Sequence, residues 1–270
     1  MHLQDKIVII TGASSGIGQA CALAFAAEGC HIVLAARNAE ALEKTAEACA
    51  KKGVKTLVIQ TDVAIEADCK NLISETLVKF GKIDILINNA GMSMRALFED
   101  TDLDVLKRLM DVNFWGTVYC TKYALPALLQ TKGSVVGISS IAGYKGLPGR
   151  TGYSASKFAM NGFLEVLRIE NLKKGLHVLT CAPGYTASNI RNTALTKDGS
   201  TQAESPLDES KLMQPEEVAA EIIAAIKKRK NTLILTTQGK MTVLLNKFFP
   251  KFMDKMVYNT IAKEKDSPFR

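Results

Sequence analysis

Short runs of β-branched and other apolar residues alternate along this 270-residue chain with longer stretches of helical periodicity, and no other feature restricts its fold as strongly. Short apolar runs are typical of strands buried on both faces, and a helix between successive runs connects parallel neighbours. The alternation predicts an α/β fold with a doubly wound, Rossmann-type parallel sheet of about seven strands, covered by helices on both faces. The strands are expected at 6–11, 31–35, 55–60, 83–88, 134–139, 177–182 and 232–235.

Helices are expected in the intervals, at 16–28, 39–52, 66–80, about 103–129, 153–173 and 215–228. The chain has no Pro- or Gly-rich linker, low-complexity tract or solenoid-type repeat, so residues 1–240 are predicted to form a single domain. Residues 241–270 add an extra amphipathic helical tail, broken at Pro250, in which apolar residues alternate with Lys.

Two interpretations of residues 241–261 remain open. These residues either pack on the same domain or on another subunit, or they make a peripheral contact with a membrane surface. Packing is favoured, because most apolar stripes on helices are buried.

The composition is that of an ordinary globular protein, with 47% hydrophobic and 23% charged residues and a net charge of +7. The basic residues are spread over helices that also carry acids, so solvated helix faces explain them better than a nucleic-acid partner does. The six cysteines stand singly, and the apolar run near the N-terminus is too short for a leader or a membrane span. These features favour reduced thiols and a cytoplasmic protein.

A glycine-rich turn follows the first predicted strand and opens the first predicted helix, with the order Thr11-Gly12-Ala13-Ser14-Ser15-Gly16-Ile17-Gly18. Its glycines let the backbone approach a pyrophosphate, and the N–H groups of the helix end favour that anion. The spacing G-x-x-x-G-x-G differs from the general dinucleotide pattern G-x-G-x-x-G. On its own the turn could also be a purely structural connection.

The end of the second predicted strand bears on the choice of dinucleotide. An acidic residue there would bind the adenosine 2′-hydroxyl. Ala36 stands where that acid is expected and Arg37 follows, so a 2′-phosphate would meet a cation. The pattern predicts NADP(H) in preference to NAD(H), unless Arg37 merely ends a strand in solvent.

Tyr153 and Lys157 are four residues apart and therefore share one face of a predicted helix. An ammonium near the phenol favours its ionised form, so that a pKa of about 10 moves toward the range where protons exchange at neutral pH. Ser140 ends a strand, and its hydroxyl can reach the same pocket and hydrogen-bond a substrate oxygen. Each residue alone has an ordinary structural explanation, but together with the glycine turn they indicate a catalytic group.

Over residues 6–189 the chain resembles the short-chain dehydrogenase/reductase family, with a pattern like that of its hydroxysteroid dehydrogenase branch. Residues 11–18 match the family's T-G-x-x-x-G-x-G, and Asn88-Asn89-Ala90-Gly91 matches its N-N-A-G. Pro183-Gly184 matches the P-G after the sixth strand. The catalytic tetrad of the family is matched by Asn113, Ser140, Tyr153 and Lys157.

The resemblance implies contacts that the spacing alone does not predict. Asp62 and Val63 would border the adenine, Asn89 would line the cofactor groove, and Asn113 would hold a water in a proton relay. Ser188 stands where the family commonly has a Thr that contacts the carboxamide, and Thr186 stands where Val or Ile is usual. The full set expected to bind the cofactor is Gly12, Ser14, Ser15, Gly16, Ile17, Gly18, Arg37, Asp62, Val63, Asn89, Ala90, Gly91, Tyr153, Lys157, Pro183, Gly184, Thr186 and Ser188. No metal site is predicted.

The resemblance further implies hydride transfer between a nicotinamide and a carbonyl or secondary alcohol. Ser140 would polarise the oxygen, Tyr153 would act as the general acid and base, and Lys157 would lower the pKa of the phenol. The segment at about 189–213 is where the family places its substrate lid. Family members usually form homodimers or homotetramers through the helices before and including Tyr153.

The substrate is less constrained by the sequence. Met92, Met94, Leu147 and Tyr185 are expected near the pocket, and they favour reduction of an apolar ketone or aldehyde over that of a sugar. Two other functions stay open: a catalytically silent NADP-binding regulatory protein of the same fold, and an isomerase or dehydratase. The intact tetrad argues against the first, and the sequence shows no additional acid or base for the second.

Overall fold

Seven parallel strands form the central sheet, in the order β3-β2-β1-β4-β5-β6-β7. They belong to a computed structural model that describes residues 2–202, 212–264 and 267–269. The strands are β1 (Ile7–Thr11), β2 (His31–Ala36), β3 (Thr56–Gln60), β4 (Ile85–Asn88), β5 (Ser134–Ile138), β6 (His177–Ala182) and β7 (Thr232–Ile234). Ile9 of β1 pairs with Val33 on one side and with Leu86 on the other. The predicted doubly wound parallel sheet is confirmed.

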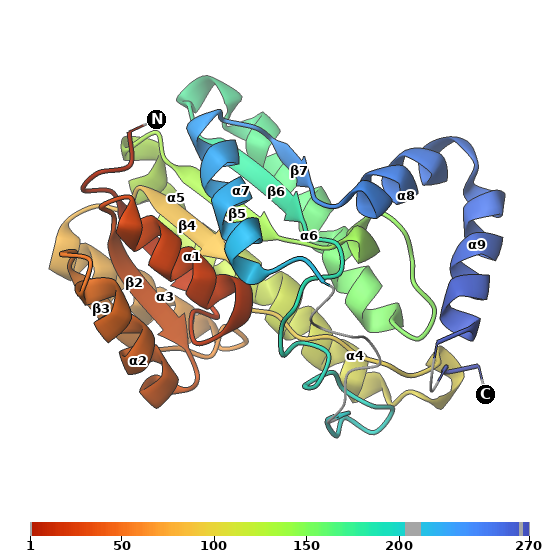
Figure 1. Cartoon of the computed structure of the whole chain (residues 1–270). Helices are drawn as coiled ribbons and strands as arrows, with labels where there is room; N and C mark the ends of the chain where they lie inside the picture. Colours follow the sequence, from red (N-terminus) through yellow and green to blue (C-terminus); the bar gives the residue numbers. More distant parts are fainter. Residues whose placement is uncertain (1, 203–211, 265–266, 270) are drawn as a thin grey trace.

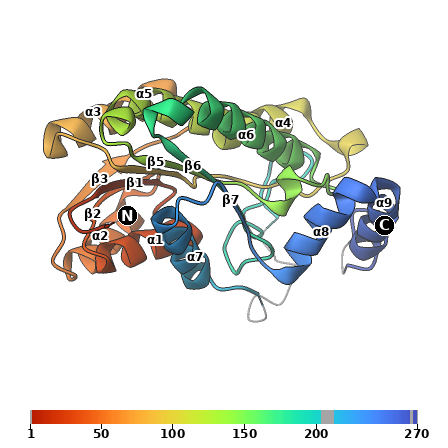
Figure 2. The same ribbon diagram turned by 90° about the horizontal axis from the view of Figure 1, so that it is seen from above.

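Helices cover both faces of this sheet (Figures 1 and 2). One face carries α1 (Gly16–Ala27), α2 (Ala39–Ala50) and α7 (Pro215–Lys227), and the other carries α3 (Glu66–Phe80), α4 (Leu103–Met110), α5 (Gly116–Gln130) and α6 (Thr151–Glu170). Short helical turns are η1 (Phe98–Asp100), η2 (Asp111–Trp115), η3 (Ile141–Gly143) and η4 (Leu172–Lys174). The two helical layers explain why the strands read as continuous apolar runs, since each strand is buried on both sides.

Alternate residues of β1 enter two separate cores. Val8 and Ile10 pack with Phe25 under α1, whereas Ile7 and Ile9 pack with Leu164 under α6. All four β1 residues are almost completely excluded from solvent. The central strand is therefore held rigidly, and so is the turn that follows it.

The long helix expected at about 103–129 is interrupted, which corrects that prediction. The π-helical turn η2 separates α4 from α5, and the Gly116 N–H bonds back five residues to the Asp111 carbonyl. The extra residue in this turn directs Asn113 inward, where its side chain binds the backbone of Met92. Hydrophobic periodicity does not reveal one inserted residue, and such insertions are frequent at functional sites.

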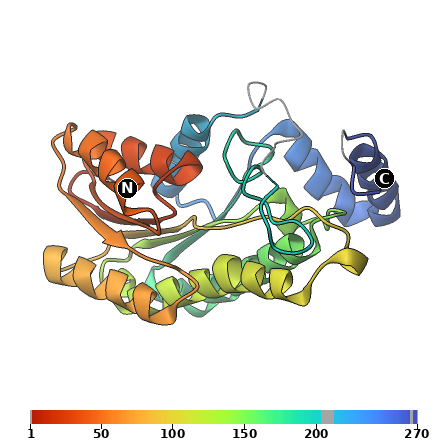
Figure 3. The ribbon, with the colours of Figure 1, turned by 90° about the horizontal axis from the view of Figure 1, so that it is seen from below.

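Two helices follow the sheet, α8 (Thr237–Phe248) and α9 (Pro250–Ala262), and they confirm the helical tail with its break at Pro250. They extend to one side of the sheet in all three views (Figures 1 to 3). Met253 and Ile261 are the buried residues of α9, and the Asn246 side chain donates to the Tyr144 carbonyl at 3.0 Å. Lys145 forms an ion pair with Asp254. The inner side of the tail therefore packs against the body of the chain.

Candidate active site

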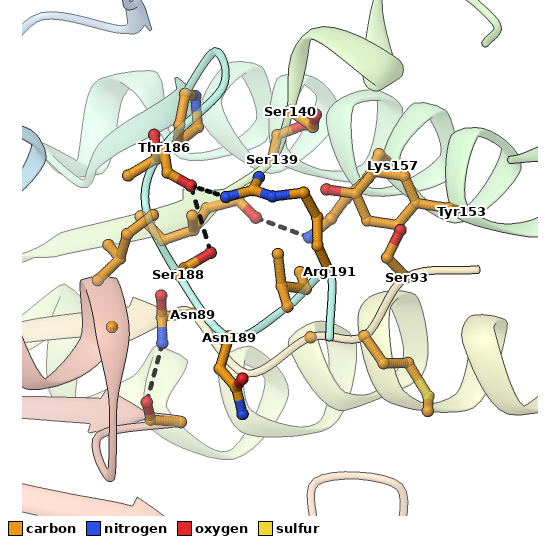
Figure 4. Close-up of a pocket in the computed structure, with 18 of the residues that line it drawn as sticks. Asn89, Ser93, Ser139, Ser140, Tyr153, Lys157, Thr186, Ser188, Asn189 and Arg191 are labelled. Carbon is orange, nitrogen blue, oxygen red and sulfur yellow. Dashed lines mark hydrogen bonds between the residues drawn. The ribbon is translucent and has the colours of Figure 1, made fainter. Parts of the chain in front are cut away.

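A cavity of about 530 Å³ opens at the carboxyl end of the sheet. It lies where the direction of winding reverses between β1 and β4, the place at which open α/β sheets bind ligands. Loops after all seven strands and the inner sides of α8 and α9 form its walls, and Figure 4 shows the polar side chains gathered around it.

The glycine turn is pressed against the loop after β4. Gly12 and Gly16 have φ angles of 65° and 54°, in the left-handed region that favours glycine. A Cβ on Gly12 would lie 2.9 Å from the Ala90 Cα, and the Asn89 side chain donates to the Gly12 carbonyl at 3.1 Å. This tight contact keeps the turn open toward the cavity.

Gly18 has a different role from its neighbours in the turn. It does not line the cavity, whereas Gly12, Ser14, Ser15, Gly16 and Ile17 all do. A Cβ on Gly18 would lie only 2.2 Å from the Gly12 carbonyl oxygen, so this residue allows the turn to close rather than facing a ligand.

The end of β2 forms one limit of the cavity, with Ala36 and Arg37 on its wall. Arg37 is exposed and forms no ion pair within the described ranges. Asp62 and Val63, at the end of β3, line the same region. The Asp62 carboxylate accepts the Ala64 N–H at 3.0 Å, which holds it to its own loop. A guanidinium is thus the group that this end of the cavity offers to a ligand.

Ser140, Tyr153 and Lys157 meet on the wall of the same cavity (Figure 4). Ser140 lies between β5 and η3, whereas Tyr153 and Lys157 lie on α6. Lys157 is only 3% exposed, and its Nζ donates to the Ile138 carbonyl at 2.7 Å. This Nζ lies 5.8 Å from the centre of the Tyr153 ring. Burial lowers the pKa of Lys157 to about 7, because water no longer stabilises the ammonium.

The groups around Tyr153 shift the pKa of its phenol in opposite directions. Burial raises the pKa of its phenol above the usual value, while a hydrogen bond with Ser140 and the positive charges of Arg150 and Arg191 lower it. Burial in apolar surroundings therefore disfavours the phenolate form of Tyr153, whereas the nearby cations favour it.

Asn113 lies behind the cavity wall and is fully buried. Its Oδ1 accepts the Met92 N–H at 2.8 Å, and its Nδ2 donates to the Ser156 hydroxyl at 2.9 Å. A Cβ on Gly91 would lie 3.1 Å from this Oδ1 and 3.6 Å from the Lys157 Nζ. Asn113 thus connects the loop after β4 with α6, directly behind Lys157.

These motifs occur together in one known family. A family model described as short chain dehydrogenase matches residues 6–199. This chain belongs to the short-chain dehydrogenase family. It is an oxidoreductase by that membership, and the predicted resemblance is confirmed.

Similar short-chain dehydrogenases occur in animals and plants. The chain is 37% identical to "Dehydrogenase/reductase SDR family member 7B" of Bos taurus, over 98% of this chain and 84% of the relative. It is 42% identical to "11-beta-hydroxysteroid dehydrogenase-like 4A" of Arabidopsis thaliana, over 72% of this chain and 65% of the relative.

Solved structures show the same fold. A short chain dehydrogenase/reductase from Burkholderia phymatum in complex with NAD has a TM-score of 0.83 at 23% identity, and the match covers 93% of this chain and 96% of that one. An alcohol dehydrogenase from Thermococcus sibiricus complexed with 5-hydroxy-NADP has a TM-score of 0.74 at 24% identity, with 85% and 94% covered.

The remaining predicted residues of this short-chain dehydrogenase also reach the cavity. Asn89, Ala90 and Gly91 line it after β4, and Pro183, Gly184, Thr186 and Ser188 line it after β6. Of the apolar residues expected near the pocket, Met92, Leu147 and Tyr185 are on its wall, whereas Met94 is fully buried beside Val105 and Leu109. The lid expected at about 189–213 lies partly outside the described residues, at 203–211.

Several cavity residues were missed by sequence reasoning. Arg150 donates to the Ser93 hydroxyl at 2.8 Å, and Arg191 donates to the Thr186 carbonyl at 2.6 Å. The tail adds further wall residues, namely Thr236, Gln238, Gly239, Thr242, Met256, Val257, Thr260 and Ile261. No local pattern marks them, because they reach the cavity only through the packing of distant segments.

Proposed function

We propose that this protein transfers hydride between NADP(H) and a carbonyl or secondary alcohol, and that it reduces an apolar ketone or aldehyde. One observation carries the proposal. Ser140, Tyr153 and Lys157 face the same cavity as the open glycine turn, so proton-handling groups and a dinucleotide cradle share one space. A bound nicotinamide would supply the hydride there.

The protein's own residues handle the oxygen and its proton. The Ser140 hydroxyl hydrogen-bonds the substrate oxygen and holds it beside the phenol of Tyr153. Tyr153 donates its proton as negative charge develops on that oxygen, and it takes the proton back when an alcohol is oxidised. The positive charges of Arg150 and Arg191 lower the pKa of Tyr153 and so favour its phenolate form. The Lys157 ammonium, 5.8 Å from the centre of the ring, acts in the same direction when it carries its proton.

The cavity fits a dinucleotide with a 2′-phosphate. The glycine turn brings backbone close to the cavity at the N-terminus of α1, which favours a pyrophosphate. Arg37 would bind the 2′-phosphate, since Ala36 stands in place of a repelling carboxylate. The structural relatives were solved with NAD and with 5-hydroxy-NADP, which supports a nicotinamide cofactor without distinguishing the two classes.

The substrate side of the cavity favours an apolar molecule. Met92, Leu147, Val257 and Ile261 lie on its wall. The name of the Arabidopsis relative includes a hydroxysteroid dehydrogenase, which is in keeping with such a substrate. A panel of apolar ketones, aldehydes and sugars, followed by nicotinamide absorbance, tests the assignment. Preferential turnover of sugars would contradict it.

Replacing Tyr153 by Phe tests the proton role. We expect Tyr153→Phe to lose turnover by about a thousandfold or more while NADPH binding, followed by its fluorescence, changes little. Unaltered turnover would remove Tyr153 from the mechanism. A wild-type protein that binds NADPH but turns over no compound of the panel would favour a regulatory role.

Replacing Arg37 by Asp tests the cofactor preference. The variant should reverse the ratio of kcat/KM for NADPH to that for NADH, because a carboxylate repels the 2′-phosphate and accepts the 2′-hydroxyl. An unchanged ratio would refute the role of Arg37.

Oligomerisation belongs to the same proposal. Phe158, Val166 and Ile169 of α6 are 47%, 53% and 63% exposed, an apolar surface suited to a homodimer or homotetramer. Light scattering of the wild type and of Val166→Glu tests it. A monomeric wild type would exclude it.

A further inference from the structure

The outer side of the α8–α9 tail carries large apolar side chains that no described part of the chain covers. Phe248, Phe249 and Phe252 are 64%, 59% and 58% exposed. They surround the turn between the two helices, which projects from the body of the molecule (Figures 1 and 2). We define these three phenylalanines as the aromatic tip. Met241 and Leu244 extend the exposed apolar surface along α8.

The opposite side of the tail is already occupied. Met253 and Ile261 are buried, and Val257 and Ile261 form part of the wall of the active-site cavity. Asp254 is paired with Lys145 on the body. The tail therefore cannot turn over to bury the aromatic tip without losing its contacts with the body and opening the cavity.

The charges around the aromatic tip have one sign. Lys240, Lys247, Lys251 and Lys255 are exposed on the two helices. Asp254 is the sole acidic residue between 237 and 262, and it is already neutralised by Lys145. An exposed apolar surface flanked by lysines matches a negatively charged, apolar partner.

We propose that the aromatic tip docks on the surface of an anionic lipid bilayer. The phenylalanines enter the boundary between headgroups and acyl chains, while the lysines remain at the level of the lipid phosphates. A second copy of this chain fits less well, because a two-fold contact would place the same lysines against one another. No helix in the described part of the chain is long and apolar enough to cross a bilayer, so the contact is interfacial.

The sequence left two interpretations of residues 241–261, packing on the protein and contact with a membrane surface, and the two apply to opposite sides of the tail. The inner side packs on the same chain, and the outer side meets lipid. Because the inner side also lines the cavity, docking brings the cavity close to the bilayer surface.

Vesicle sedimentation with the full chain tests the proposal. Wild type is mixed with phosphatidylcholine vesicles that contain either no anionic lipid or roughly one third phosphatidylserine. We expect binding to the anionic vesicles that weakens as salt is added. Phe248→Ser/Phe252→Ser should lower the partition coefficient by about tenfold or more, since each exposed ring contributes apolar area.

Ile65→Ser/Val78→Ser is the matched control. These two apolar residues are 50% and 80% exposed but lie at the start and near the end of α3, away from the tail. This variant should bind vesicles like the wild type. Lys247→Gln/Lys251→Gln should reduce the preference for phosphatidylserine while leaving the weaker binding to phosphatidylcholine.

The proposal is overturned if the wild type does not bind anionic vesicles, or if the tip and control variants bind alike. It is also overturned if the tip variant lowers the subunit number measured by light scattering, because the aromatic tip would then be a contact between copies. None of these readouts depends on turnover, so a failure of the proposed enzymatic function is recognised separately.

Discussion

Lys157 is expected to destabilise the cofactor-free fold while serving the active site. Its ammonium is buried at the end of β5, with the Ile138 carbonyl as its hydrogen-bond partner. Lys157→Met keeps the apolar stem and removes the charge. We expect the cofactor-free variant to be more stable than the wild type at pH 7 and inactive in turnover.

The magnitude follows from the pKa of Lys157. Burial lowers it from 10.5 to about 7, which corresponds to a stability penalty of about 4 to 5 kcal/mol for the charged form. The variant leaves the Ile138 carbonyl without this donor, a loss of about 1 to 3 kcal/mol. The free energy of unfolding should therefore rise by about 2 kcal/mol at pH 7.

The pH dependence has a definite sign. Between pH 7 and pH 10.5 the unfolded chain keeps a proton on Lys157 that the folded chain has released, so the stability of the wild type rises with pH in this window. The advantage of the variant should shrink by about 3 kcal/mol between pH 7 and pH 10 and change sign near the upper end.

Urea unfolding of the cofactor-free protein at several pH values measures this difference. Lys122→Met, at an exposed position of α5, is the control and should show no such dependence on pH. A constant difference between wild type and Lys157→Met from pH 7 to pH 10 would refute the reasoning, because Lys157 would then keep its charge in the folded protein.

Three further predictions concern the turn, the thiols and the phenol. Gly18→Ala would place a Cβ 2.2 Å from the Gly12 carbonyl oxygen, so we expect a loss of about 2 kcal/mol in urea unfolding and weaker NADPH binding. The six cysteines are buried, and burial raises the pKa of the Cys21 thiol to about 12. A thiol reagent should therefore react with the cysteines only after denaturant is added. Rapid labelling of the native protein would contradict this expectation. Ser140→Ala removes a hydrogen bond that lowers the pKa of Tyr153. The residual alcohol oxidation of this variant should therefore need a higher pH than that of the wild type. A pH profile of alcohol oxidation equal to that of the wild type would show that the hydrogen bond between Ser140 and Tyr153 does not act on this pKa.

The local pattern of the sequence was enough to predict the strands, the glycine turn and the catalytic spacing. An apolar run such as 7–10 is typical of a strand buried on both faces, and the spacing from Tyr153 to Lys157 places both on one helical face. Apart from the interrupted helix, the boundaries differed by at most three residues, since helix and strand ends depend on neighbouring contacts. The π-helical turn at Asn113 left no periodic signal.

Only the tertiary structure decided the environment of the proposed catalytic group. The spacing brought Lys157 near Tyr153, but it did not reveal that burial opposes both charges or that Arg150 and Arg191 favour the phenolate. The sequence also did not show that the tail closes one side of the cavity through contacts such as Asn246 with Tyr144, 102 residues apart. A pKa depends on every group packed around a side chain and on the water that packing excludes, and these are set by the folding of distant segments onto one another.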